Sequence, residues 1–280
     1  MVPLTFLALF PFLLTGLLAM EASSRVALSP QMAKWKAEIE AGGKTTVVLA
    51  RVFTDAGRNE LVLPGDAEFR PFLRTLLESK PFVTQLVQTH AINVNSNTGL
   101  RPISVVLLNM ARAADWDGQE SSVIAHEFGH IWLHVRGYQA PHVARGLSCE
   151  AVHAGDIVQH ILIREQMSIR RIDFLPFWIR TLEVALDELN AKTGDQPQQR
   201  IDPCQRISRL ALWVDVVLGV SDKEWSRRPL LLAAFQKNFP ELDQPATGIA
   251  TMLRGKNLQD HQTYERLLRD VLVAVHRAER

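Results

Sequence analysis

The spacing of apolar residues changes character partway along the chain. Short runs rich in β-branched residues predict strands at Lys44–Phe53, Ala91–Val94 and Ile103–Asn109. From Ser121 onward, apolar residues recur every three or four positions, which predicts helices. The chain is therefore predicted to be an α+β protein, in which a small sheet is followed by a mostly helical C-terminal portion.

The helical spacing also gives approximate element boundaries. A helix is predicted over Ala67–Lys80 with Pro71 in its first turn, and a turn over Asn95–Pro102 separates the second and third strands. Further helices are predicted over Ser121–Tyr138, Ser148–Gln166, Leu175–Lys192, Cys204–Val220 and Tyr264–Arg280. We therefore expect an α/β portion over residues 44–140 and a helical portion over residues 141–280.

The N-terminus differs from the rest of the chain. Its first twenty residues contain no charged side chain and consist mostly of Leu and Phe. Small residues near their end predict a signal peptide over residues 1–22, with cleavage between Ala19 and Ser24. An uncleaved membrane anchor is the alternative, because roughly 20 apolar residues can span a bilayer. We expect export, into a periplasm or out of the cell, with membrane attachment only if the segment is retained.

Composition limits the classes of function. Of the 280 residues, 47% are hydrophobic and 22% are charged, which is typical of a globular protein rather than a disordered one. Lys and Arg (31) nearly balance Asp and Glu (30), so no broad basic field for nucleic acid is expected. The function must therefore be inferred from a local site.

One predicted helix carries the residues of a metal site. His126 and His130 are four positions apart, so both imidazoles project from one helical face and can bind one Zn²⁺. Glu127 is rotated by about 100° from His126. This separates the predicted roles into two metal ligands and one general base that activates a water.

The sequence His126-Glu127-Phe128-Gly129-His130 matches HExxH and resembles the active-site helix of the zincin metallopeptidases. The resemblance implies a zincin-like fold, a zinc cofactor and hydrolysis of peptide bonds in a peptide or protein substrate. The metzincin branch is excluded, because Leu133 and Arg136 occupy the positions of its glycine and third histidine.

The resemblance to thermolysin-like gluzincins implies that Glu150 is the third ligand, since 19 residues separate it from His130. Glu150 is also explained as an ordinary acidic residue in the first turn of a helix. His153 and Asp156 are the alternative ligands. His134 is excluded, because it lies about 12 Å along the helix axis from His126.

The chain also departs from the gluzincin pattern. Ala154 stands where those enzymes have an aspartate that orients a zinc-bound histidine. The donor to the oxyanion is not assigned; Tyr138, His142, His153 and His160 are the candidates. In zincins an edge strand binds extended substrate, a role that Ile103–Asn109 fills only if it is not an ordinary buried strand. A non-catalytic zinc-holding protein that binds another exported protein is therefore the alternative function.

The two cysteines, Cys149 and Cys204, both lie in the predicted exported part. An even pair in an oxidising compartment predicts one disulfide. Two buried free thiols are the alternative.

Overall fold

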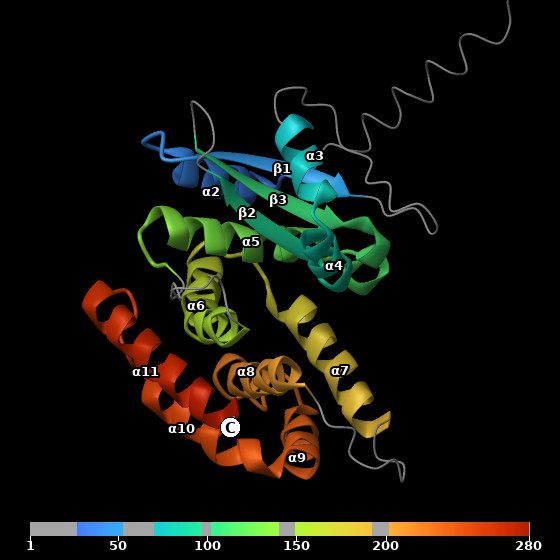
Figure 1. Cartoon of the computed structure of the whole chain (residues 1–280), viewed down its shortest axis with the longest axis vertical. Helices are drawn as coiled ribbons and strands as arrows, with labels where there is room; N and C mark the ends of the chain where they lie inside the picture. Colours follow the sequence, from blue (N-terminus) through green and yellow to red (C-terminus); the bar gives the residue numbers. More distant parts are fainter. Residues whose placement is uncertain (1–26, 53–69, 97–101, 140–148, 192–201, 280) are drawn as a thin grey trace, which may run out of the picture. The chain divides into compact units, whose positions relative to one another are not determined.

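The computed structural model describes residues 27–52, 70–96, 102–139, 149–191 and 202–279 (Figure 1). The predicted signal peptide and His142 lie outside these ranges. The chain divides into two compact units, Met1–Ile131 and Trp132–Arg280, and the division falls inside helix α5 (Glu120–Val135). All described strands belong to the first unit and the second unit is helical where it is described, which confirms the predicted α+β class.

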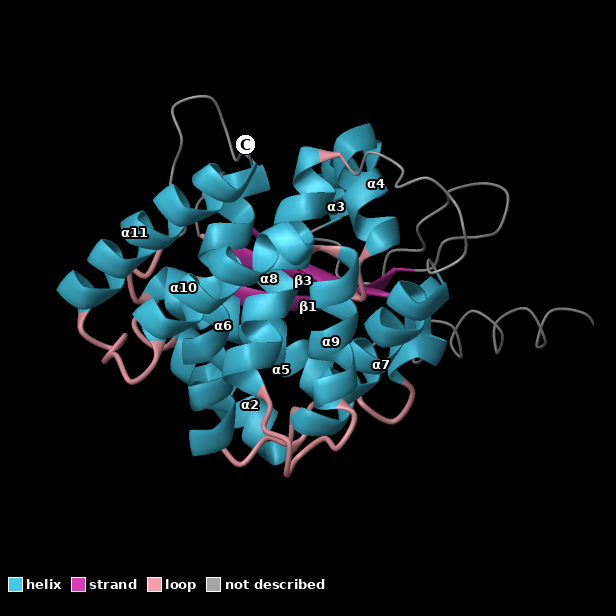
Figure 2. Cartoon of the chain, turned by 90° about the horizontal axis from the view of Figure 1, so that it is seen from below, coloured by secondary structure: helices cyan, strands magenta, loops and turns pink. Residues whose placement is uncertain are grey.

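Three strands form the sheet of the first unit, drawn in magenta in Figure 2. Strand β3 (Ile103–Asn109) lies between β1 (Thr46–Val52), to which it is parallel, and β2 (Ala91–Ser96), to which it is antiparallel. The three predicted strands are confirmed. The edge role for Ile103–Asn109 is wrong, because β3 is the central strand and all seven of its residues are buried.

Helices cover both faces of the sheet, which explains the unbroken apolar run of β3. On one face, α3 (Arg70–Glu78) and α4 (Lys80–Gln88) enclose an apolar cluster. The buried members of this cluster are Ala50, Val52, Leu73, Leu86, Ile103, Val105 and Leu107. The helix predicted over Ala67–Lys80 corresponds to α3 within the described residues, whereas α4 was not predicted.

The other face of the sheet packs against α2 (Pro30–Glu40) and α5. The fully buried ring of Trp35 in α2 meets Phe128 in α5 edge to face, at a centroid distance of 6.2 Å. The backbone N–H of Val47 donates to the Glu40 carboxylate at 2.8 Å and so joins α2 to β1. A 3-10 helix, η1 (Met110–Trp116), leads from the sheet to α5.

The second unit is a bundle in which α6 packs against α8 and α11, α10 packs against α8 and α11, and α7 packs against α9. Its helices are α6 (Cys149–Ile169), α7 (Leu175–Ala191), α8 (Pro203–Gly219), α9 (Arg228–Asn238), α10 (Asp243–Leu253) and α11 (His261–Glu279), with a 3-10 turn, η2 (Pro240–Leu242). The predictions of α6, α7, α8 and α11 are confirmed. In the described ranges no helix has both the length and the hydropathy needed to cross a bilayer.

Candidate metal centre

Both histidines of the HExxH sequence project from the same side of α5. Apolar positions at helical spacing, including Ile124, Phe128 and Ile131, are buried and fix the opposite side of the helix. His126 and His130 are half-buried, and their Nε2 atoms lie 3.2 Å apart. Their rings are close to perpendicular, with an interplanar angle of 80°. The helix therefore brings the two predicted ligand nitrogens together.

The spacing of these nitrogens suits a zinc ion. Two nitrogens bound to tetrahedral zinc at about 2.0 to 2.1 Å must be roughly 3.3 Å apart. The observed 3.2 Å meets this requirement without rotation of either side chain. It also suits a hydrogen bond from one imidazole to the other, which would hold the pair in place without metal.

Glu127, the predicted base, is buried, with 7% of its surface exposed. Its Oε2 accepts a hydrogen bond of 2.6 Å from the Nδ2 of Asn93 in β2. Burial of a carboxylate requires such a partner, since an unpaired charge is costly away from water. The sheet thus fixes one oxygen of the residue that stands next to the histidine pair.

A second contact fixes α5 against the sheet. The Arg51 guanidinium donates to both oxygens of Glu120, through Nη2 at 2.7 and 3.0 Å and through Nε at 3.1 Å. Glu120 lies in the first turn of α5, where a carboxylate also interacts favourably with the helix dipole. β1 and β2 therefore both hold the helix that carries the site.

Glu150, predicted as the third ligand, belongs to the second unit and lies in the first turn of α6. Its Oε1 lies 2.8 Å from the Nδ1 of His276 in α11, and Glu279 is 3.8 Å from the same nitrogen. These three side chains could hold a cation, with ligand atoms within 4.8 Å of one another. The role of Glu150 in a site with His126 and His130 stays a prediction.

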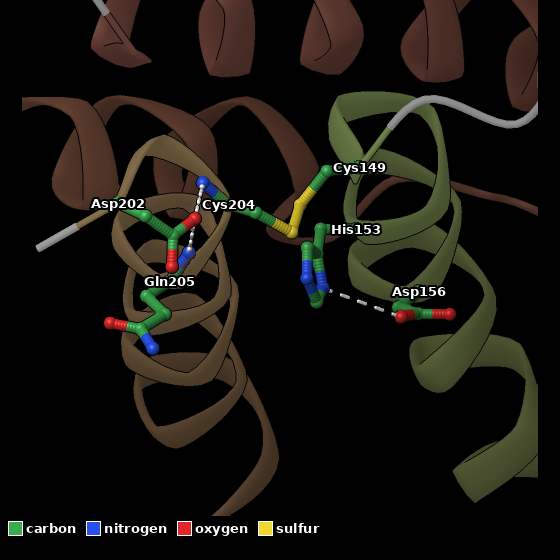
Figure 3. Close-up of a disulfide and its surroundings, with 6 residues drawn as sticks. All are labelled: Cys149, His153, Asp156, Asp202, Cys204 and Gln205. Carbon is green, nitrogen blue, oxygen red and sulfur yellow. Dashed lines mark hydrogen bonds and ion pairs between the residues drawn. A yellow bond between two sulfur atoms is a disulfide. The ribbon is translucent and has the colours of Figure 1, made fainter. Parts of the chain in front are cut away.

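The predicted disulfide between Cys149 and Cys204 is confirmed, and it joins the starts of α6 and α8. The alternative of two free thiols is therefore wrong. The two other residues predicted as alternative ligands, His153 and Asp156, lie next to this disulfide (Figure 3). The Nδ1 of His153 is 3.6 Å from a carboxylate oxygen of Asp156.

A buried charge network in the second unit was not predicted. Asp215 in α8 contacts two residues of α6, His160 through Nδ1 at 2.7 Å and Arg164 through Nη1 at 3.1 Å. The Arg164 guanidinium also lies over the ring of Trp178 in α7, 5.8 Å from its centroid. A Cβ atom on Gly219 would come within 2.9 Å of that guanidinium, so the glycine gives Arg164 room.

This network shifts the titration of both partners. Burial lowers the pKa of His160, but the Asp215 carboxylate outweighs burial and holds the pKa above its ordinary 6.5. Burial raises the pKa of Asp215, but the His160 and Arg164 cations outweigh it and hold the pKa below its ordinary 3.8. Between pH 3.8 and 6.5, therefore, the Asp215 carboxylate is ionised and contacts two cations, His160 and Arg164.

Tyr138, one of the oxyanion candidates, has another role in the second unit. Its hydroxyl donates to the backbone carbonyl of Gln259 at 2.6 Å, and its ring stacks on His261 at a centroid distance of 4.0 Å. Burial raises the pKa of this hydroxyl, the charge of Arg136 lowers it by less, and the charge of Asp260 adds to the increase. The contacts favour a structural role over donation to substrate.

Asn93 and Asp215 are the contributors that the sequence reasoning missed. Asn93 interrupts a short apolar strand, and Asp215 is the single acid in the apolar run Leu210–Val220. Both are polar residues at positions where an apolar one would pack, and that signal could have identified them. Comparison of the chain with models of protein families, with curated proteins and with solved structures finds no match.

Proposed function

We propose that the chain is an exported, zinc-dependent metallopeptidase of the HExxH type. The observation that carries the proposal is the pair of Nε2 atoms of His126 and His130, 3.2 Å apart, with Glu127 between them in sequence and buried beside Asn93. The arrangement of a sheet behind the helix is compatible with a zincin-like fold. The apolar N-terminal segment supports export.

The residues divide the reaction into separate tasks. Zinc, when bound, would lower the pKa of a water and polarise the substrate carbonyl. Glu127 takes the proton of the attacking water and delivers it to the leaving amine, so that the amide bond breaks as a neutral amine departs. Asn93 is a positioning residue, because its Nδ2 donates a hydrogen bond of 2.6 Å to Oε2 of Glu127 and so fixes the orientation of the carboxylate.

Strand β2 supports a peptide as the substrate class. Among the described strands β2 pairs only with β3, and Asn93 on β2 touches Glu127. An extended peptide that adds to the outer edge of β2 would run along the strand that holds the proposed base.

Zinc content tests the metal claim. Wild type should bind one zinc per chain at this site. His126→Ala should lose it, because at most two protein ligands remain at the site. His134→Ala is the matched control, because His134 is an exposed histidine of the same helix. Equal zinc content in the His126→Ala and His134→Ala variants would refute the site.

Glu127→Gln tests catalysis separately from binding. The amide keeps the shape of the side chain but cannot accept the proton, so the variant should retain zinc and lose hydrolysis of a peptide library. Full hydrolysis by Glu127→Gln would remove this residue from the mechanism.

Zinc affinity also identifies the third ligand. Alanine variants of Glu150, His153 and Asp156 form one series, and the ligand is the residue whose loss lowers affinity most. His160 joins this series, because a carboxylate on Nδ1 is the usual support of a zinc-bound histidine and Asp215 supplies it.

A non-catalytic zinc-holding protein that binds an exported partner is the second candidate. The hydrogen bond from the Tyr138 hydroxyl to Gln259 and the alanine at position 154 favour it. The first occupies a candidate oxyanion donor, and the second replaces the aspartate that orients a zinc-bound histidine in the thermolysin-like enzymes. Intact zinc, no hydrolysis of any peptide or protein substrate, and one stoichiometric partner would support this function instead.

A further inference from the structure

Three metal-ligating side chains meet at the disulfide of the helical unit. Cys149 and His153 lie one turn apart on α6, and Cys204 lies in the first turn of α8 (Figure 3). The two sulfur atoms and one ring nitrogen of His153 all lie within 4.8 Å of one another. Two thiolates and an imidazole are a preferred ligand set for zinc.

We propose that Cys149, Cys204 and His153 form a second, redox-gated zinc site, which is closed in the disulfide form and opens when the disulfide is reduced. This inference concerns the second unit alone and goes beyond the proposed peptidase function. The Cα atoms of the cysteines are 5.6 Å apart, and the sulfurs must separate to about 3.8 Å to bind tetrahedral zinc at about 2.3 Å each. Rotation about the Cα–Cβ bonds provides this movement without a shift of the helices.

The helix ends favour the thiolate form that zinc requires. Cys149 begins α6 and Cys204 follows Pro203 at the start of α8, so both sulfurs lie at the positive end of a helix dipole. Asp202 caps α8 by accepting from the backbone N–H groups of Cys204 and Gln205, which fixes the backbone at one ligand.

Asp156 completes the surroundings of the site. Its carboxylate lies 3.6 Å from the Nδ1 of His153, with a side chain that is 32% exposed. An acidic group beside a ligating imidazole orients the ring and raises its basicity. The three proposed ligands therefore lie on two helices that pack together, α6 and α8, and Asp156 orients the one imidazole among them.

Reduction is chemically accessible here, since Cys204 is exposed. A dithiol transfers two electrons and two protons to the disulfide, becomes a disulfide itself, and leaves Cys149 and Cys204 as thiols. Zinc then binds both sulfurs as thiolates and releases two protons.

Cobalt(II) binding tests the proposal on the full chain. The background is His126→Ala/His130→Ala, which removes the proposed catalytic centre, so that failure of one site is not confused with failure of the other. The reductant is a water-soluble phosphine, which is oxidised to its phosphine oxide by oxygen from water and does not compete for metal as a dithiol does. The reduced chain should bind one cobalt with a thiolate-to-metal charge-transfer band, and the oxidised chain should show none.

The variants separate the site from simple thiol binding. His153→Ala should weaken cobalt affinity by about tenfold or more, since loss of even an outer group costs that much. His134→Ala is the matched control, because His134 is an exposed histidine of the same unit and belongs to none of the metal-ligating groups described above. The proposal would be overturned if no charge-transfer band appears after reduction. It would also be overturned if the His153→Ala variant binds cobalt as tightly as the chain that retains His153.

Circular dichroism covers the case in which reduction unfolds the helical unit. Zinc should then restore the helical signal of the reduced chain, because metal binding to a folded site contributes folding free energy. A reduced chain that stays unfolded with zinc present would equally overturn the proposal.

Discussion

Replacement of Asp215 by alanine removes the carboxylate that two largely buried cationic side chains of α6 contact. The Asp215 side chain is 7% exposed, and those of His160 and Arg164 are 15% and 13% exposed. Removal of one partner from a buried ion pair costs about 3 to 5 kcal/mol, because the remaining charge is left poorly solvated. His160 can relieve part of this cost by losing its proton, so we expect a loss near the lower end, about 3 kcal/mol.

This loss is large against the total stability of a domain, which is about 5 to 15 kcal/mol. For a unit of this size each kcal/mol lowers the melting temperature by roughly 2 to 4 °C, so Asp215→Ala should lower it by roughly 6 to 12 °C. Urea unfolding of the metal-free chain, followed by circular dichroism, measures the free energy directly.

The loss should also depend on pH in a defined way. The pKa of His160 is raised, so its contribution is complete below 6.5 and disappears as pH rises through the folded-state pKa. The pKa of Asp215 is lowered, so its contribution is complete above 3.8 and disappears as pH falls through the folded-state pKa. The difference between wild type and Asp215→Ala should therefore be largest between these two values and shrink on either side.

Asp222→Ala is the matched control in the same unit. Asp222 pairs with Arg228 at 2.7 Å, but its side chain is 62% exposed, so the loss should be about 0 to 1 kcal/mol. Equal losses for Asp215→Ala and Asp222→Ala, or a loss for Asp215→Ala that does not vary with pH, would refute the reasoning.

Three further substitutions test other contacts. Asn93→Ala should lower the free energy of unfolding by about 1 to 3 kcal/mol, because the buried Glu127 loses the hydrogen bond from Asn93. Urea unfolding measures this, and an unchanged value would contradict the role of the contact. Cys204→Ser should cost up to about 4 kcal/mol, since the disulfide spans 55 residues, and calorimetry of wild type in reductant should match the variant. Leu107→Ala, in a fully buried residue of β3, should cost about 2 to 5 kcal/mol, and a smaller loss on urea unfolding would mean that the sheet core is loosely packed.

The sequence was most informative where one physical signal dominates. The helical spacing in α6 and α8 follows from the faces that these helices bury against each other. The disulfide followed from an even cysteine count. By contrast, α2 has no strong apolar periodicity, and its start is indicated only by the Ser29 cap and Pro30.

The position of β3 in the sheet illustrates what local pattern leaves open. Four consecutive apolar residues, Val105 to Leu108, indicate burial on both faces, but strand order depends on pairing between distant segments. The same limit applies to the contact between Asn93 and Glu127, which joins residues 34 positions apart. The proximity of His126 and His130, both on α5, was predictable, and the contact that β2 supplies through Asn93 was not.

The buried network in the helical unit needs a reason beyond stability. Replacement of a buried ion pair by well-packed apolar residues of similar volume is often neutral or stabilising by about 1 to 4 kcal/mol. A contribution to stability therefore does not explain why Asp215 and Arg164 are charged. The Asp215 carboxylate fixes the tautomer and orientation of the His160 imidazole, which an apolar side chain could not do.

Asp215→Asn in the zinc-affinity series distinguishes the two explanations. If the network positions His160 as a ligand, Asp215→Asn should weaken zinc binding by about 10- to 100-fold, as loss of an outer carboxylate does elsewhere. If the network is only structural, Asp215→Asn should lower the free energy of unfolding and leave zinc affinity unchanged. Glu150→Ala is the complementary test. If Glu150 is the third ligand, Glu150→Ala should weaken zinc binding and Asp215→Asn should not, because the Glu150 carboxylate is held by His276 and not by the network.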